Sequence, residues 1–357
     1  MTLYALNGDS NLYYHKSLRL YIVCYVDDLL LLGDDDLIVS TLSALSKSLL
    51  LRETGKLDEG TSVDFLGRVI TKHNGAITLT MDPKFIDTLL DEMNMKTCKP
   101  SPTPGSETLK RATVENEEPV DAETHKLYRR MVGKLLWLTN VRNDIMFAVK
   151  ELSRGLQQPT LLHMNKLKHL LRYLSGTKTL AETLRPNRQL LLDPSKTAID
   201  INTFVDSDWA GCNTTRKSTS GCALFVLGVN LCGISRTQQT IALSSGEAEL
   251  YAIGLGVSES LYVRTLLLES KLCSKCNITL HTDSTAGKSM ASRHGLSRKT
   301  KHVQLRFLFV QELVLSGQIR LKKVLGTNNP SDIFTKYVTA DTLQRHLPVL
   351  GYFSHKL

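Results

Sequence analysis

The chain has 357 residues, of which 42% are hydrophobic and 22% are charged, and its formal net charge is +9 at pH 7. This length accommodates roughly two or three domains, the composition is that of a soluble globular protein, and the positive charge favours an anionic partner. The seven scattered cysteines and the lack of signal-peptide features argue against secretion and for the cytosol or the nucleus.

The first hundred residues predict mixed α and β structure. Two short apolar runs meet at Asp27 and Asp28, a pattern typical of two strands joined by an acidic turn. The same stretch, 20–32, is too short and too interrupted to cross a bilayer, so no membrane partner is expected. Asn74 and Gly75 predict a hairpin, because both tolerate the positive φ of a primed turn. The expected elements are strands at 21–26, 29–32, 63–70 and 76–80 and a helix from 82 to about 95.

Residues 99–124 predict a linker, since they hold four prolines and six acids and almost no apolar periodicity. Beyond it, apolar residues recur at helical spacing in three stretches and predict a helical connector over 125–190. The third of these helices is expected to end at Gly176 as a C-terminal cap.

From residue 199 the pattern changes to three successive strands, a long helix, and then alternating strands and helices. Pro330 is expected to open the last helix, because proline suits the first helical position. This order predicts a mixed sheet covered by helices. The expected strands are 199–205, 222–227, 231–235, 278–282 and 319–324, and the expected helices are 244–268 and 299–315 and one from 330.

Four carboxylates lie at the ends of strand patterns or on helix patterns: Asp206, Glu249, Asp283 and Asp332. Taken singly, each is more typical of a surface or cap position. Together they occupy elements that converge at one end of a mixed sheet, and buried acids persist there when a base or a metal ion holds them. Oxygen ligands suit Mg²⁺, so the set predicts a metal site that cleaves phosphodiesters.

Two further patterns leave alternatives open. The window 288–323 holds nine basic residues and one acid, Glu312, which is typical either of a solvated face or of a surface that follows phosphates. Cys273, Cys276 and His281 match most of a zinc knuckle, but Ala286 stands where the fourth ligand should be, so no zinc site is expected.

Six ordered motifs closely resemble the ribonuclease H domain of copia-type retrotransposon polyproteins. They begin with Phe204-Val-Asp-Ser-Asp-Trp-Ala-Gly and continue at 215–221, 244–252, 281–288, 301–302 and 332–336. Upstream, Tyr25-Val-Asp-Asp resembles the palm motif of a reverse transcriptase, and 128–139 and 171–177 resemble the connecting segment. The resemblance implies an α/β fold with a ribonuclease H-like mixed sheet at 191–357, preceded by a partial α+β palm and thumb at 1–98, the linker at 99–124 and the helical connection at 125–190.

The resemblance further implies that Asp206, Glu249, Asp283 and Asp332 bind two Mg²⁺ ions, with Mn²⁺ as the alternative. These ions would support hydrolysis of the RNA strand of an RNA–DNA hybrid, leaving a 3′-hydroxyl and a 5′-phosphate. Two neighbouring acids compete for these roles: Asp208 shares a strand face with Asp206, and Glu247 lies on another helix face from Glu249 and is expected to be exposed.

The family's partners are RNA, DNA and their hybrid, and the loop 215–221 is expected to touch the nucleic-acid backbone. The residues that the resemblance assigns to nucleic-acid binding are Arg216, Lys217, Ser218, Ser284, Lys301 and His302.

Two departures from related enzymes stand out. The stretch 324–331 lacks the histidine that cellular and retroviral ribonucleases H place before the last acid. Asp27 and Asp28 lack a third palm aspartate, because Asp9 is the sole acid before Tyr25, so we expect a polymerase remnant in a truncated fragment. The alternatives are a non-catalytic nucleic-acid-binding remnant, and a fragment that works only with a complete polymerase subunit or polyprotein in trans.

Overall fold

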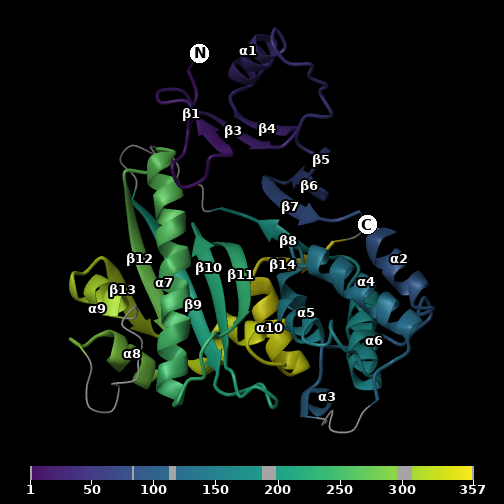
Figure 1. Ribbon diagram of the computed structural model, residues 1–357. Coiled ribbons are helices and arrows are strands. Elements are labelled where there is room, and N and C mark those ends of the chain that lie inside the picture. The colour runs from purple at the N-terminus through teal and green to yellow at the C-terminus, as the bar shows by residue number, and fades with distance from the viewer. Residues whose placement is uncertain (1, 83, 112–117, 187–197, 296–307, 356–357) are drawn as a thin grey trace.

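A computed structural model describes residues 2–82, 84–111, 118–186, 198–295 and 308–355 of the chain. Three sheets and a group of helices make up these residues (Figure 1). Within these ranges, no helix is both long enough and apolar enough to cross a membrane.

The first sheet is antiparallel and contains the acidic turn. Tyr25 pairs with Asp28, so Val26 and Asp27 form the turn between two strands, as predicted. Asp27 and Asp28 are both exposed. The elements are β1 (Tyr4–Ala5), β2 (Leu12–Tyr14), β3 (Leu20–Tyr25) and β4 (Asp28–Gly33), followed by α1 (Asp35–Leu45).

The second sheet joins the N-terminal, middle and C-terminal parts of the chain. Its order is β14-β8-β7-β6-β5, with β5 (Ser62–Phe65), β6 (Arg68–His73), β7 (Ala76–Thr80), β8 (Leu180–Leu184) and β14 (Tyr352–Ser354). Asn74 and Gly75 have φ of 50° and 70°, which confirms the primed turn. The single strand expected at 63–70 is wrong, because Leu66 and Gly67, both at positive φ, turn the chain between β5 and β6.

The three helices predicted after the linker are present, although the range predicted as a helical connection, 125–190, also contains the strand β8. The helices of the connector are α4 (Ala122–Leu138), the 3₁₀ turn η1 (Asn143–Ile145), α5 (Met146–Ser153) and α6 (Leu161–Gly176), and α2 (Lys84–Glu92) packs against α6. The predicted linker is not free of structure, since it contains α3 (Glu107–Arg111) and a buried Ser101. Gly176 is the last residue of α6 but does not adopt the left-handed cap conformation. The domain boundaries at 98, 124 and 190 stay predictions.

The third sheet confirms the mixed α/β class. Its order is β11-β10-β9-β12-β13, and β9 to β11 are antiparallel whereas β12 and β13 run parallel to β9. Its strands are β9 (Ala198–Asp208), β10 (Thr219–Val226), β11 (Val229–Thr237), β12 (Lys275–Thr282) and β13 (Ile319–Lys323). Its helices are α7 (Ser245–Glu269), α8 (Thr285–Ala291), α9 (Leu308–Leu315) and α10 (Ala340–Val349), with 3₁₀ turns η5 (Gly326–Asn328) and η6 (Pro330–Phe334). The helix expected from Pro330 is therefore the short η6, and α10 is separate.

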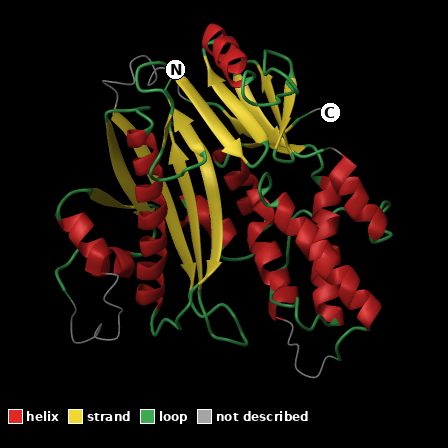
Figure 2. Cartoon of the chain, turned by 45° about the horizontal axis from the view of Figure 1, so that its top comes forward, coloured by secondary structure: helices red, strands yellow, loops and turns green. Residues whose placement is uncertain are grey.

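Strand β10 is buried along its whole length and contributes side chains to two hydrophobic cores. Because side chains alternate across a strand, Cys222 and Leu224 face the core under α7, whereas Ala223 and Phe225 face the helices α2 and α4 to α6. Figure 2 shows α7 and this helical group on either side of the sheet. The helices of the connector therefore pack against one face of the sheet and share a hydrophobic core with it.

Candidate metal centre

Three of the four predicted acids meet at one edge of the third sheet. Asp206 lies near the end of β9, and Asp283 follows the end of β12 directly. These strands are parallel neighbours that pair Val205 with Thr282, so they end at the same edge. Glu249 lies in the second turn of α7. One carboxylate oxygen from each of Asp206, Glu249 and Asp283 lies within 4.8 Å of the others.

The environment of these acids favours a cation. Asp206 and Glu249 are buried, and Asp283 is half-buried. Burial, reinforced by the charges of Asp206 and Asp283, raises the pKa of Glu249 to about 8. Burial and the charge of Asp206 also raise the pKa of Asp283. Within the described residues, Glu249 Oε2 is buried without a hydrogen-bond partner. An all-oxygen donor set of this charge fits a hard divalent ion.

The start of α7 explains how Glu249 reaches the centre. Ser244 caps the helix by accepting a hydrogen bond from Glu247 N at 3.2 Å. The Glu247 carboxylate accepts from Leu243 N at 2.7 Å and from the Tyr251 hydroxyl. Glu247 is only 2% exposed, so the expectation of an exposed residue is wrong. Its carboxylate completes a variant of the capping box. Glu249 is about 200° further around the helix, on the side of Asp206 and Asp283.

The fourth acid, Asp332, lies on η6, which packs against β9 and β10. Asn329 holds this segment in place by donating from Nδ2 to Val205 O at 3.0 Å and accepting from Ser331 Oγ at 2.6 Å. Gly221 pairs with Asp206 across the sheet, and a Cβ there would lie 2.8 Å from Ser331 O. Glycine therefore permits the close approach that brings Asp332 beside the other acids.

Thr335 and Lys336, which follow Asp332 in the chain, both contact Asp206, and neither was predicted as a site residue. Thr335 Oγ1 donates a hydrogen bond to Asp206 Oδ2. Lys336 Nζ lies 3.5 Å from Asp206 Oδ2 and 3.2 Å from Asp332 Oδ1. Burial and the charge of Asp206 raise the pKa of Asp332 to about 7, although Lys336 opposes this shift. The signal for both residues was available, because they belong to the motif at 332–336.

The loop expected to contact nucleic acid lies between β9 and β10. Arg216 is exposed at a positive φ of 56°, and its N–H donates to Cys212 O at 2.8 Å. Lys217 is half-buried, and its carbonyl accepts from Cys212 N at 3.2 Å. Ser218 is completely buried and accepts a hydrogen bond from Ala210 N at 3.0 Å. Its assignment as a nucleic-acid contact is therefore corrected to a structural role inside the loop.

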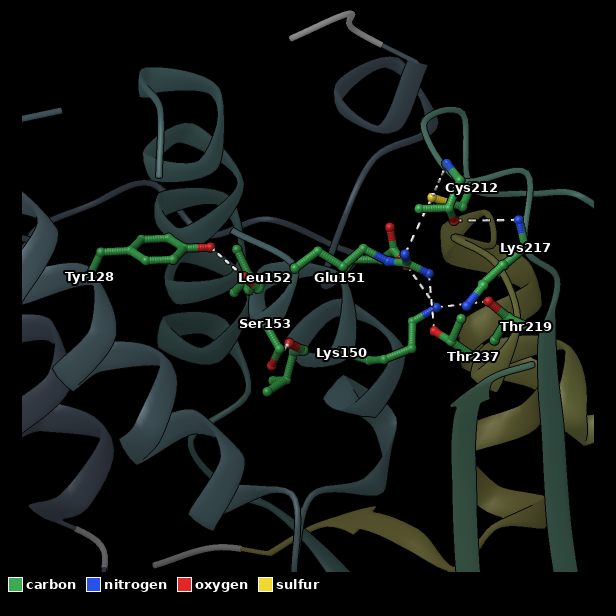
Figure 3. A network of polar contacts seen from close by, with 12 residues as sticks. Tyr128, Lys150, Glu151, Leu152, Ser153, Cys212, Lys217, Thr219 and Thr237 are labelled. Atoms are coloured by element: carbon green, nitrogen blue, oxygen red, sulfur yellow. Dashed lines mark hydrogen bonds and ion pairs between the residues drawn. The ribbon is translucent and has the colours of Figure 1, made fainter. Parts of the chain in front are cut away.

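The C-terminal end of α5 supports this loop (Figure 3). Lys150 Nζ donates to Thr219 Oγ1 at 2.7 Å, at the start of β10. Arg154 donates to Cys212 Sγ at 3.3 Å and to Thr237 Oγ1 at 3.0 Å. Glu151 Oε1 lies 2.7 Å from the Lys150 ammonium and 3.0 Å from Arg154 Nε, so the two cations are held together. The connector thus sets the position of the loop.

Of the remaining assigned residues, Ser284 directly follows Asp283, and the others lie outside the three-acid group or outside the described ranges. Ser284 caps α8, because its hydroxyl accepts from Gly287 N at 3.0 Å. Lys301 and His302 lie outside the described residues. Asp208 is half-buried and, with Asp27 and Asp28, is not a member of the three-acid group.

The cysteine and histidine pattern does not gather around one point. Cys273 and Cys276 Sγ atoms lie 3.3 Å apart. His281 instead contacts Asn202 Oδ1 at 3.1 Å through Nε2 and stacks on Phe204. In the described ranges the sole group of three potential metal-binding side chains is the acidic one.

Comparison with known proteins finds Pol polyproteins of transposons among those similar in sequence to this chain. The chain is 28% identical over 332 residues to the retrovirus-related Pol polyprotein from transposon RE1 of Arabidopsis thaliana, covering 93% of this chain and 21% of that protein. It is 33% identical over 244 residues to an uncharacterized mitochondrial protein of Arabidopsis thaliana, covering 67% of this chain and 92% of that protein. The chain thus spans about a fifth of the Pol polyprotein.

A solved structure of the foamy viral protease-reverse transcriptase in complex with RNA/DNA hybrid aligns at a TM-score of 0.45 and 13% identity, over 85% of this chain and 35% of that chain. No protein-family model matches the chain.

Proposed function

The chain belongs to the Pol polyproteins of copia-type retrotransposons, and from this premise we propose that its C-terminal part hydrolyses the RNA strand of RNA–DNA hybrids with divalent metal ions. The observation that carries the proposal is the convergence of Asp206, Glu249 and Asp283 at the edge of the sheet, where the first two are buried and the third is half-buried. Carboxylates so placed are costly unless a cation is bound.

The three acids would hold an ion of the Mg²⁺ or Mn²⁺ type. When bound, such an ion would neutralise charge on the scissile phosphate and lower the pKa of the attacking water. Thr335 fixes the orientation of the Asp206 carboxylate by its hydrogen bond, and η6 brings Asp332 to the same place. The exposed Arg216 and the half-buried Lys217 would contact phosphates, and preference for RNA would come from contacts to its 2′-hydroxyls.

The proposal covers the nuclease and not polymerisation. Asp27 and Asp28 lie in an exposed turn of a separate sheet, and no third acid joins them to form a metal-binding group within the described residues. We therefore assign the acidic turn no reaction. The proposed place of action is the cytosol or the nucleus, where the nucleic-acid partners occur.

The test uses the full chain, a hybrid labelled on its RNA strand, and Mg²⁺ or Mn²⁺ against a chelator control. Cleavage that requires metal and disappears in Asp206→Asn, but persists in Asp208→Asn, supports the proposal. Salt-sensitive binding without cleavage in either metal would overturn it in favour of a non-catalytic binding protein. A parallel reaction with the complete polyprotein added identifies a fragment that is active only in trans.

A further inference from the structure

Lys336 is placed between two acids of the candidate metal centre. Its ammonium lies 3.5 Å from Asp206 Oδ2 and 3.2 Å from Asp332 Oδ1. The side chains of Asp206 and Asp332 are 5% and 15% exposed, whereas that of Lys336 is 40% exposed. The lysine therefore reaches from the surface into a buried acidic site.

The four acids are thus divided into two unequal groups. Asp206, Glu249 and Asp283 converge, with one carboxylate oxygen of each within 4.8 Å of the others. Asp332 is outside this group and has Lys336 as its ion-pair partner. Asp206 belongs to both groups, since it also contacts Thr335 and Lys336 through Oδ2. The centre therefore already contains one internal cation on one side of Asp206.

We propose that Lys336 takes the place of a second metal ion: the free chain binds one divalent ion, at Asp206, Glu249 and Asp283, and the ammonium keeps a second ion from the space between Asp206 and Asp332. The inference rests on the proposed function in one respect, namely that the three converging acids hold a metal.

Simple electrostatics supports this competition. A divalent ion bound to both Asp206 and Asp332 needs direct contact with their oxygens, at about 2.0–2.1 Å for Mg²⁺. The ammonium is already within 3.5 Å of an oxygen of each, so the ion and the ammonium repel each other and compete for the same carboxylates. A partly exposed lysine on a flexible stem is able to swing outward, so a bound phosphodiester could draw the ammonium away and open the second position.

The test measures metal binding without substrate, by calorimetric titration of the full chain with Mn²⁺. The wild-type chain is expected to bind one ion. Lys336→Met is expected to bind two ions, and its affinity for the second ion should be at least about tenfold above any residual second binding in the wild type. Lys336→Arg, which keeps a cation near the acids, is expected to bind one ion like the wild type.

Lys323→Met is the matched control, because it removes a positive charge whose field reaches Asp283 from a side chain that hydrogen-bonds to Thr285 and does not bridge Asp206 and Asp332. It is expected to leave the stoichiometry at one. Thermal unfolding of each variant checks its fold, and Lys336→Gln replaces Lys336→Met if the latter does not fold.

Equal isotherms for the wild type and Lys336→Met would overturn the inference. If both bind two ions, only the role of Lys336 fails and the metal centre stands. If the wild type binds no ion, the proposed metal-dependent function fails with it. A gain of a second ion in Lys323→Met would also contradict the inference, since it would trace the effect to net charge and not to the ion pair.

Discussion

Glu247 and Glu249 lie two residues apart on α7 and are both buried, yet their carboxylates meet opposite surroundings. Glu247 accepts hydrogen bonds from Leu243 N and the Tyr251 hydroxyl, so its burial is compensated. Glu249 faces Asp206 and Asp283, and its pKa is raised to about 8 by burial and by these charges. One acid stabilises the helix start, and the other is a carboxyl whose ionised form is disfavoured until a cation stabilises it.

This contrast predicts opposite effects of two matched substitutions. Glu247→Gln should lower the free energy of unfolding by about 1–3 kcal/mol, because an amide replaces the acceptor of two hydrogen bonds, and should leave metal binding intact. Glu249→Gln should leave the metal-free stability unchanged or higher and abolish the stabilisation that added Mg²⁺ gives. Urea unfolding of the full chain with Mg²⁺ and with a chelator measures both. Loss of metal stabilisation in Glu247→Gln would contradict the assignment.

At the scale of elements, α5 and the loop before β10 form one unit although they are about 60 residues apart. The hydrogen bonds of Arg154 to Cys212 and Thr237 tie the end of α5 to the loop itself and to the end of β11, which pairs with the start of β10. Because α5 also contributes to the core on one face of the sheet, the loop is positioned by the connector and not by the sheet alone.

Arg154→Met is therefore expected to weaken hybrid binding several-fold and to make the loop around Arg216 more susceptible to trypsin, while the three-acid group keeps its metal affinity. Binding is measured by fluorescence anisotropy at two salt concentrations, and cleavage by mass spectrometry. Arg129→Met, which removes the same charge from an exposed position of α4, is the control and should match the wild type. Equal behaviour of the two variants would show that α5 does not set the loop.

Elements with long local patterns were predictable from sequence, and those defined by distant partners were not. β9 to β13 and α7 follow from runs of apolar residues and clear turns. β8 has five residues, and its partners β7 and β14 lie about a hundred residues before it and more than 160 after it, so no local signal marks it. Likewise the four acids were predictable from their strand and helix patterns and from the family resemblance, but the ion pair of Lys336 depends on how η6 docks against Gly221.

For the whole molecule, the second sheet is where the three parts of the chain are joined. β8 pairs with β7 from the N-terminal part and with β14 from the C-terminal end. The core beside it contains Leu90 from α2, Tyr128 from α4, Phe334 from η6 and Tyr352 from β14. A fragment limited to 190–357 would expose one side of this core, which is why the experiments above use the full chain.

Glu182 lies at this junction and links stability to pH. It is 4% exposed in β8 and opposite Tyr352. Burial raises its pKa from 4.5 to about 8, although the charge of Arg68 opposes the shift. Between these two values the folded chain holds a proton that the unfolded chain has released. The stability therefore falls as pH rises, by up to about 1.4 kcal/mol per pH unit, and levels off above the folded pKa.

Glu182→Gln should remove this contribution, because the amide has no proton to lose. Urea unfolding of the wild type and the variant is measured from pH 5 to 9 with a chelator, so that metal binding at the acidic centre does not intervene. The pKa values of Glu249 and Asp332 are also raised, so these two groups also make stability fall as pH rises. Their contribution is the same in the wild type and in Glu182→Gln and cancels in the difference between them. The difference in unfolding free energy between variant and wild type should thus grow toward alkaline pH. A constant difference would mean that Glu182 is already ionised in the folded chain and that the junction tolerates its charge.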